Sequence, residues 1–273
     1  MVVKEGDYGP RLELSTGWSD RACKLALQVH LKELELNYAK GWKRGDLSFL
    51  SKLPDIESLE IIEWNLDSVS SIHSLPNLRR LQVSTYCKTP IDFAAFPKLE
   101  SCSIEWRPGC DSLFAHRRIH TLFLNRYPGK DFQNFSRMPN LRALQVCSAG
   151  VESCMGLPST LHSLVLGACR KLSSLNGLDA LQDLGKLEID GSRKLAGIRE
   201  IASLRGLRVL HLLDCGNIQS LAPVSDLSQL ETVLFYGTTN IVDGDLLPLQ
   251  KLPNLAKTAF QERSHYSHKL ADF

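Results

Sequence analysis

The sequence lacks the features that mark membrane-inserted or nucleic-acid-binding proteins. Its first residues contain no continuous apolar core of signal-peptide type, and no apolar run approaches the roughly 20 residues needed to cross a bilayer. With 32 Lys and Arg against 30 Asp and Glu, the net charge of +2 is too small to indicate nucleic acid or an acidic membrane surface. We therefore expect a cytoplasmic protein with no inserted segment.

Paired cysteine motifs are also missing. The chain has eight cysteines, but none form CxxC pairs or share a zinc-type spacing with histidines. Free thiols are typical of a reducing compartment, so we expect all eight to be reduced. They are Cys23, Cys87, Cys102, Cys110, Cys147, Cys154, Cys169 and Cys215.

Motifs for catalysis are absent as well. The sequence contains no GxxxxGK[ST] phosphate loop, no GxGxxG after a strand and no GxSxG elbow. His265 and His268 near Asp272 form the nearest approach to a metal site, but two solvated histidines in a terminal cap explain them better. The Asp-Gly-Asp at 243–245 lacks the further ligands of a calcium loop and is interpreted as a turn. We expect no enzyme activity, cofactor or metal.

What the sequence does contain is a repeat. The pattern apolar-x-x-apolar-x-apolar recurs eleven times, with starts separated by 25, 22, 21, 20, 22, 20, 23, 23, 23 and 25 residues. The starts are Leu31, Ile56, Leu78, Leu99, Ile119, Leu141, Leu161, Leu184, Leu207, Leu230 and Leu255. In a strand the two apolar residues of the LxL pair point to one face, and stacked copies bury that face in one continuous core.

A second apolar set at three-residue spacing follows each strand, as in Val69, Ile72 and Leu75. This spacing favours a 3₁₀ turn or short helix that returns along the opposite side. The segments LPNLRRLQV and LSQLETVLF resemble leucine-rich repeats of about 22 residues of the bacterial, internalin-like class. In LVLGACRKLSSL, a cysteine replaces the asparagine of the usual repeat. The resemblance implies an α/β solenoid, a horseshoe with a parallel concave sheet and a 3₁₀ or short-helix convex side.

The ends of the chain predict caps rather than further domains. Leu12 and Leu14 lie 22 residues before Leu34 and Leu36, which indicates a degenerate first strand, and Ser19 can begin a short amphipathic helix. We expect a single domain over 1–273, with an N-terminal cap at 1–30, eleven repeats over 31–260 and a C-terminal cap at 261–273.

The strand register predicts two groups of side chains for partner binding. The third, fifth and seventh positions of each repeat point outward onto the concave face, where the first strands carry Glu33, Glu35 and Glu60 and a later strand carries Phe123. Just after the strands, large side chains of hot-spot type should line one rim. These are Tyr38, Trp42, Trp64, Tyr86, Trp106, Arg107, Arg126 and Tyr127. The alternative for Trp64, at the asparagine-equivalent position, is that it points inward as a core filler.

Farther along the face, two adjacent strands predict an outward apolar patch around His211. Its other members are Val209, Leu213, Leu234 and Tyr236. A monomer seldom exposes a sizeable apolar patch without a use, although ordinary strand propensity also places such residues there. Cys147 faces outward too, whereas Cys102, Cys169 and Cys215 occupy positions that indicate structural roles.

These features favour a non-catalytic scaffold that binds an unidentified protein partner through its concave face and adjacent rim. A monomeric inhibitor or adaptor fits a cytoplasmic repeat protein. The alternative is an exported bacterial surface or effector protein that engages a host molecule. The scattered basic residues and sparse concave aromatics make a nucleic-acid partner the weaker hypothesis.

Overall fold

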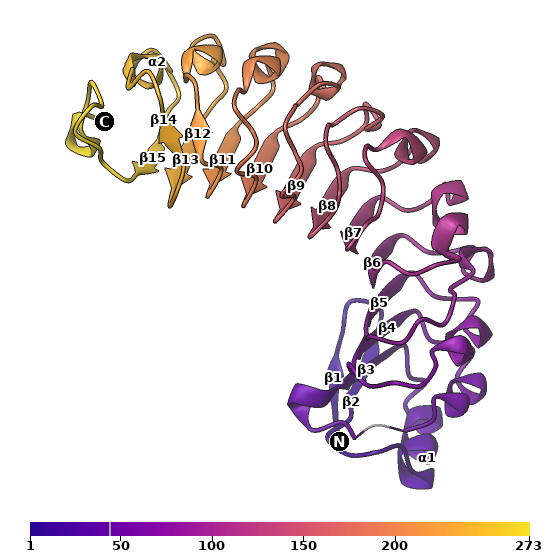
Figure 1. Ribbon diagram of the computed structural model, residues 1–273. Coiled ribbons are helices and arrows are strands. Elements are labelled where there is room, and N and C mark those ends of the chain that lie inside the picture. Colours follow the sequence, from indigo (N-terminus) through magenta and orange to yellow (C-terminus); the bar gives the residue numbers. More distant parts are fainter. Residues whose placement is uncertain (44) are drawn as a thin grey trace. The chain divides into compact units, whose positions relative to one another are not determined.

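Short strands alternate with 3₁₀ turns along the computed structural model, which describes residues 1–43 and 45–273. By their contacts the residues form two compact units, Met1–Leu122 and Phe123–Phe273, and strand β7 (Thr121–Asn125) crosses the boundary. Within each unit the strands form one layer and the helical turns form a second layer behind it (Figure 1). That the whole chain, 1–273, is a single domain stays a prediction.

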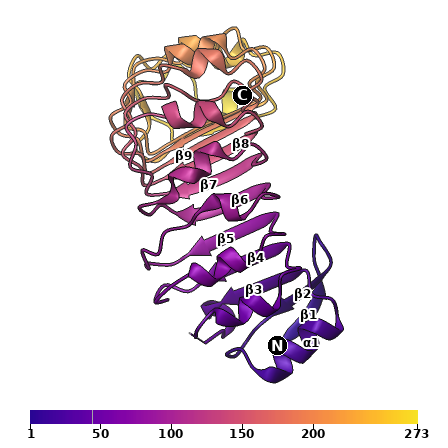
Figure 2. The same cartoon turned by 90° about the vertical axis from the view of Figure 1, so that its right-hand side faces the viewer.

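In the first unit, the order of the strands in the sheet follows their order in the chain. Its elements are β1 (Val2–Glu5), β2 (Pro10–Glu13), α1 (Asp20–Gln28), β3 (Glu33–Asn37), β4 (Ser58–Ile62), β5 (Arg80–Ser84) and β6 (Ser101–Glu105). Strand β1 pairs antiparallel with β2, and the pairs from β2 to β6 are parallel. Figure 2 shows β3 to β6 side by side.

The second unit repeats the arrangement. Its elements are β8 (Ala143–Cys147), β9 (Ser163–Gly167), β10 (Lys186–Asp190), β11 (Val209–Leu213), β12 (Asn217–Ile218), β13 (Thr232–Tyr236), β14 (Asn240–Ile241), α2 (Leu247–Gln250) and β15 (Lys257–Phe260). Strands β8, β9, β10, β11, β13 and β15 pair in parallel in this order, while β12 and β14 form a small separate sheet. Every predicted LxL motif therefore lies in a strand.

The core follows from the register, because the LxL residues of neighbouring strands stand opposite each other. Leu187 of β10 pairs with Leu164 of β9 and with Leu210 of β11, and all three side chains are fully buried. The alternating residues point to the other side of the sheet, here called the outward face. This face is the place where the repeats are free to differ, since the inward face is filled by similar apolar residues throughout.

The return segments are 3₁₀ turns, as the three-residue spacing predicts. The backbone N–H of Leu75 donates to the carbonyl of Ile72 at 3.1 Å, and the N–H of Ile72 donates to that of Val69 at 3.0 Å. All three side chains are fully buried, so the turn adds its apolar residues to the core. The 3₁₀ turns are Tyr38–Lys40, Ser48–Lys52, Ser70–Ser74, Phe93–Ala95, Cys110–Ala115, Gln133–Arg137, Leu178–Ala180, Arg199–Ser203, Ala222–Val224 and Leu270–Asp272.

The region predicted as the N-terminal cap contains two strands and a helix. Leu12 of β2 pairs with Leu34, and the Ser19 hydroxyl accepts the N–H of Ala22 at 3.2 Å at the start of α1. The sequence pattern missed β1, which adds an antiparallel strand with exposed side chains beside β2. In the second unit, Tyr266 and Phe273 each pack against Phe260, so the short tail covers part of the last strand.

Candidate binding surfaces

The acidic start of the outward face is covered by the chain itself, which corrects the expectation of an exposed acidic surface. Glu33 and Glu35 are 1% and 2% exposed. One carboxylate oxygen of Glu33 accepts the backbone N–H of Tyr8 at 2.6 Å, and Glu35 pairs with Arg11 at 2.6 Å and with Lys40 at 2.7 Å. The N-terminal segment therefore occupies the face of β3 and neutralises its charge, a contact that the repeat pattern alone does not reveal.

Of the three outward glutamates that pair with Arg11, Glu35 and Glu60 have opposite pKa directions. Burial raises the pKa of Glu35, but hydrogen bonds from Lys40 and Arg11 outweigh burial, so the pKa lies below its ordinary value of 4.5. At Glu60, burial and the charge of Glu35 raise the pKa, although Arg11 lies 3.3 Å from the carboxylate. Glu35 is the well-paired anion of this cluster, and Glu60 is the poorly compensated one.

The aromatic rim of the first unit is exposed at only some of its predicted positions. Tyr38 and Tyr86 are 49% and 55% exposed, and the half-buried ring of Trp64 lies 5.0 Å from that of Tyr86. The residues just before these two rings, Glu63 and Thr85, are the buried ones. Trp64 is therefore not the inward filler of the alternative hypothesis, because its neighbour in the chain takes the inward place.

Three predicted rim residues are buried instead, which corrects their placement. Trp42 is 3% exposed, and Arg107 and Tyr127 are 1% and 4% exposed. The turn Tyr38–Lys40 reverses the chain after β3, and the backbone N–H of Trp42 donates to the carbonyl of Asn37. The ring of Trp42 therefore lies in the core. Arg107 and Tyr127 stand at the asparagine-equivalent position, where the chain turns beneath the strand end and directs the side chain inward. In the second unit, Tyr127 packs edge-on against Phe135 at 5.3 Å.

The remaining rim and face residues are accessible to different degrees. Trp106 is half-buried, with its ring 5.6 Å from that of Phe114. Phe123 is half-buried on the outward side of β7. Arg126 is exposed and has a left-handed backbone, with φ of 61°. The predicted rim is thus a set of separate exposed side chains rather than one continuous line.

The structure brings the residues of the proposed apolar patch together on two paired strands of the second unit. In the register of β11 and β13, His211 stands opposite Leu234 and Leu213 opposite Tyr236. Val209, Leu213 and Leu234 are half-buried and Tyr236 is 43% exposed. We call these four residues with His211 the β11–β13 patch.

Charged residues of the preceding strand border this patch. The Nδ1 atom of His211 lies 3.3 Å from Glu188 of β10, which also pairs with Lys186 at 3.0 Å. Burial acts to raise the pKa of Glu188, but the hydrogen bond and charge of Lys186, followed by those of His211, lower it overall. The patch therefore has an apolar centre and a charged edge on one continuous set of strands.

Beneath the strand ends, small side chains have a structural role. Cys169 and Cys215 are fully buried, and the Cys215 thiol donates to the carbonyls of Ile189 and Leu213, both at 3.3 Å. The Ser192 hydroxyl donates to the Cys169 carbonyl at 3.3 Å. These donors pair with backbone carbonyls near the strand ends, which supports the structural interpretation of Cys169 and Cys215. Burial raises the pKa of Cys169 to about 11 and that of Cys215 to about 12.

The candidate metal ligands of the C-terminal region are occupied by local hydrogen bonds. His265 Nε2 lies 2.9 Å from the Ile241 carbonyl, and His268 Nδ1 lies 2.8 Å from the Ser267 hydroxyl. The Asp243 and Asp245 carboxylates accept backbone N–H groups two residues ahead, which is turn geometry. Across residues 1–43 and 45–273, no three His, Cys, Asp or Glu side chains are grouped as metal ligands.

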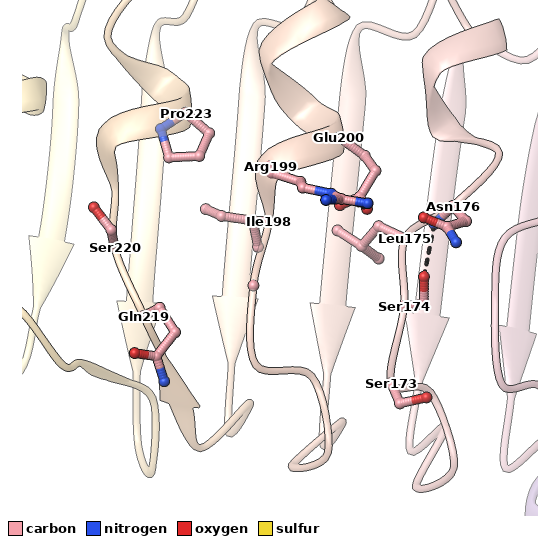
Figure 3. A pocket seen from close by; sticks show the side chains of 11 residues that line it. Ser173, Ser174, Leu175, Asn176, Ile198, Arg199, Glu200, Gln219, Ser220 and Pro223 are labelled. Atoms are coloured by element: carbon pink, nitrogen blue, oxygen red, sulfur yellow. Dashed lines mark hydrogen bonds and ion pairs between the residues drawn. The ribbon is translucent and has the colours of Figure 1, made fainter.

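A hollow of about 370 Å³ lies among the loops and 3₁₀ turns of the second unit (Figure 3). It is lined by Ser173, Ser174, Leu175, Asn176, Gly197, Ile198, Arg199, Glu200, Gln219, Ser220 and Pro223. Arg199 pairs with its neighbour Glu200 at 3.1 Å, and the Ser174 hydroxyl accepts the backbone N–H of Asn176. These polar groups serve local turns, so their hydrogen bonds indicate structure rather than a catalytic pair.

The fold and these surfaces define the class of protein: the chain has the leucine-rich-repeat fold. It is similar to an internalin from Listeria monocytogenes, with 20% identity and a TM-score of 0.53 over 85% of this chain and 81% of that one. A Leptospira interrogans leucine-rich-repeat protein has 16% identity and a TM-score of 0.53 over 91% and 76%. A TDR receptor has 13% identity and a TM-score of 0.57 over 91% of this chain, which spans about half of that receptor chain, 51%.

No protein-family model and no curated protein matches the chain. The similarity to solved structures establishes the fold, which many functions share. In the part of the chain that the structure describes, no helix has the length and apolar character to cross a membrane.

Proposed function

We propose that this chain is a non-catalytic scaffold that binds a protein partner through the outward face of its sheet, with the β11–β13 patch as the main anchor. The observation that carries the proposal is the accessibility of Leu213, Leu234 and Tyr236 together on two paired strands. The inward residues of the same strands already fill the core, so packing does not require these outward side chains to be apolar.

The chemistry of the patch suits a protein surface. An interface with a largely apolar centre and a polar rim is the usual arrangement, and tyrosine is enriched among hot-spot residues. Tyr236 supplies a large ring with a hydroxyl, while Glu188 and Lys186 supply charges at the edge. We infer that a partner places apolar side chains over Leu213 and Leu234 and polar groups near Glu188.

The exposed side chains of the rim form secondary candidate contacts. In the first unit these are Tyr38, the pair of Trp64 and Tyr86, and Trp106. In the second unit they are Arg126 and Phe123. Arg107 and Tyr127 are withdrawn as anchors, because side chains buried to this degree contribute to the fold before they contribute to an interface.

We further propose that the protein acts in the cytoplasm as a monomeric inhibitor or adaptor. All eight cysteines are free, which fits a reducing compartment. Trapping thiols in living cells and counting alkylated cysteines by mass, together with cell fractionation, tests this location. Disulfides in the trapped protein would favour the exported surface or effector role instead.

Site-directed photo-crosslinking tests the binding face. A photoreactive residue at position 234 on the patch is compared with one at Ser220, which lines the hollow among the 3₁₀ turns. In the partner's titration, Tyr236→Ala should weaken binding by about 2 kcal/mol, roughly 30-fold, while Arg199→Ala beside the hollow leaves it unchanged. If Arg199→Ala abolishes binding and Tyr236→Ala does not, the outward face is not the binding site.

A further inference from the structure

The guanidinium of Arg107 is buried, and among residues 1–43 and 45–273 no carboxylate is hydrogen-bonded to it. Arg107 is 1% exposed, and its Nε donates to the backbone carbonyl of Glu105 at 3.3 Å. Nη2 has no hydrogen-bond partner among the described residues. An arginine keeps its charge when buried, and a buried charge is unfavourable unless an anion compensates it. This position therefore calls for a negative group close to Nη1 or Nη2.

The thiol of Cys87 lies where such a group is needed. Its Sγ atom is 3.6 Å from Nη1 of Arg107, and its backbone N–H donates to the Thr85 hydroxyl. Among the residues that the structure describes, Cys87 is the one ionisable side chain that is hydrogen-bonded to this guanidinium. A cationic group therefore stands directly beside the half-buried thiol of Cys87.

The other thiols differ from Cys87 in burial or in their neighbours. Cys110 is fully buried, and burial raises its pKa even though the charge of Arg107 acts in the opposite direction. Cys147 is half-buried like Cys87, but its thiol receives a hydrogen bond from the neutral amide of Gln145 at 3.7 Å. Cys87 and Cys147 are thus a matched pair, similar in exposure and different in the charge beside the sulfur.

We propose that Cys87 is a modification site, a thiol that Arg107 activates toward hydroperoxides. In the reaction the thiolate sulfur attacks the terminal peroxide oxygen, so an S–O bond forms as the O–O bond breaks. The sulfur is oxidised by two electrons to a sulfenic acid, and the leaving hydroxide or alkoxide takes a proton from solvent to give water or an alcohol. Nη1 of Arg107, which lies 3.6 Å from the sulfur, is the nearest donor for the new oxygen.

The full-length protein is treated with hydrogen peroxide at pH 7 in the presence of dimedone, and sulfenic acid at each cysteine is measured by peptide mass spectrometry. Cys87 should react at least about threefold faster than Cys147, because the guanidinium of Arg107 stands beside its sulfur and can stabilise the negative charge that develops on the leaving peroxide oxygen. An equal or slower rate at Cys87 would overturn the proposal.

Variants at Arg107 separate activation from simple exposure. Arg107→Met should lower the Cys87 rate to that of Cys147, and Arg107→Lys should retain part of the difference. The Cys147 rate in the same sample is the internal control for an intact fold. If Arg107→Met leaves Cys87 as fast as before while Cys147 is unchanged, the guanidinium is not responsible. If Arg107→Met does not fold, the wild-type ratio decides.

Discussion

The two units fill the space beneath their strand ends in different ways. In the second unit three asparagine-equivalent positions carry small donors, Cys169, Ser192 and Cys215, each of which donates to a backbone carbonyl, while Tyr127 fills a fourth with a large buried ring. In the first unit the corresponding positions carry Trp64, Tyr86 and Arg107. Two of these large side chains turn outward and the third brings a charge into the core.

This difference shows where a repeat protein can depart from its pattern. A small donor such as Cys169 or Cys215 pairs with backbone carbonyls without changing the turn, so those repeats can vary on the outward face. Where Glu63 and Thr85 take the inward place instead, Trp64 and Tyr86 lie toward the surface. The candidate contacts of the first unit are thus produced by its irregular turns, and those of the second by its strands.

The largest expected effect tests whether the cores of the two units are equivalent. Leu81 of β5 and Leu144 of β8 are 0% and 2% exposed at the same repeat position. Alanine at either position should lower the free energy of unfolding by about 2–5 kcal/mol through lost transfer energy and a cavity. Urea unfolding of both variants measures this loss. A loss of stability at one site and none at the other would show that the strand cores of the two units are not equivalent.

The sequence was sufficient to predict the strands of the LxL repeats and the core, because the alternation within each repeat determines which side chains face inward. It also predicted the β11–β13 patch, whose members lie within two strands of known register. It did not predict that Arg107 and Tyr127 are buried while Trp64 and Tyr86 are not. At the turn, either of two adjacent residues can point inward, and periodicity does not choose between them.

The cover over Glu33 and Glu35 was missed for a different reason. Tyr8 and Arg11 reach these glutamates from about one repeat earlier in the chain, and they belong to an N-terminal segment with no repeat pattern of its own. The antiparallel strand β1 was missed in the same way. Contacts made by a cap depend on tertiary structure, whereas contacts within the repeat follow from its spacing.

An intermediate effect on the free energy of unfolding is expected from the buried threonines of the two units, Thr239 and Thr85. Thr239 donates to the Leu212 carbonyl at 2.8 Å and accepts the Cys215 N–H at 2.9 Å, whereas the two hydrogen bonds of the Thr85 hydroxyl are 3.5 and 3.4 Å long. Thr239→Val leaves two buried backbone groups unpaired and should lower the free energy of unfolding by about 1–3 kcal/mol. Thr85→Val should lower it by less than about 1 kcal/mol, because its hydrogen bonds are long. Equal losses in chemical denaturation would contradict the difference between the units.

The smallest effects on stability are expected at Glu35 and Glu60 of the first unit, which both pair with Arg11. In the second unit, by comparison, Glu188 pairs with Lys186. The pKa of Glu35 is lowered in the folded protein, so its carboxylate stabilises the fold above its ordinary pKa of 4.5, and that stabilisation is lost as the pH falls through the folded value. Glu35→Gln should therefore lower the free energy of unfolding at pH 7 by about 1–2 kcal/mol, and by less below about pH 4.

Glu60 should behave in the opposite sense. Its pKa is raised by burial and by the charge of Glu35, so the folded state favours the protonated acid and the carboxylate is unfavourable at neutral pH. Glu60→Gln mimics the protonated acid and should raise the free energy of unfolding at pH 7 by no more than about 1 kcal/mol, since the group is partly solvated. This gain should disappear as the pH falls below 4.5, where Glu60 is protonated in both states. Thermal unfolding of both variants from about pH 3 to 7 measures the two trends. If Glu60→Gln destabilises the protein at pH 7 as Glu35→Gln does, Arg11 compensates both glutamates, and the N-terminal segment holds the face of β4 as firmly as that of β3.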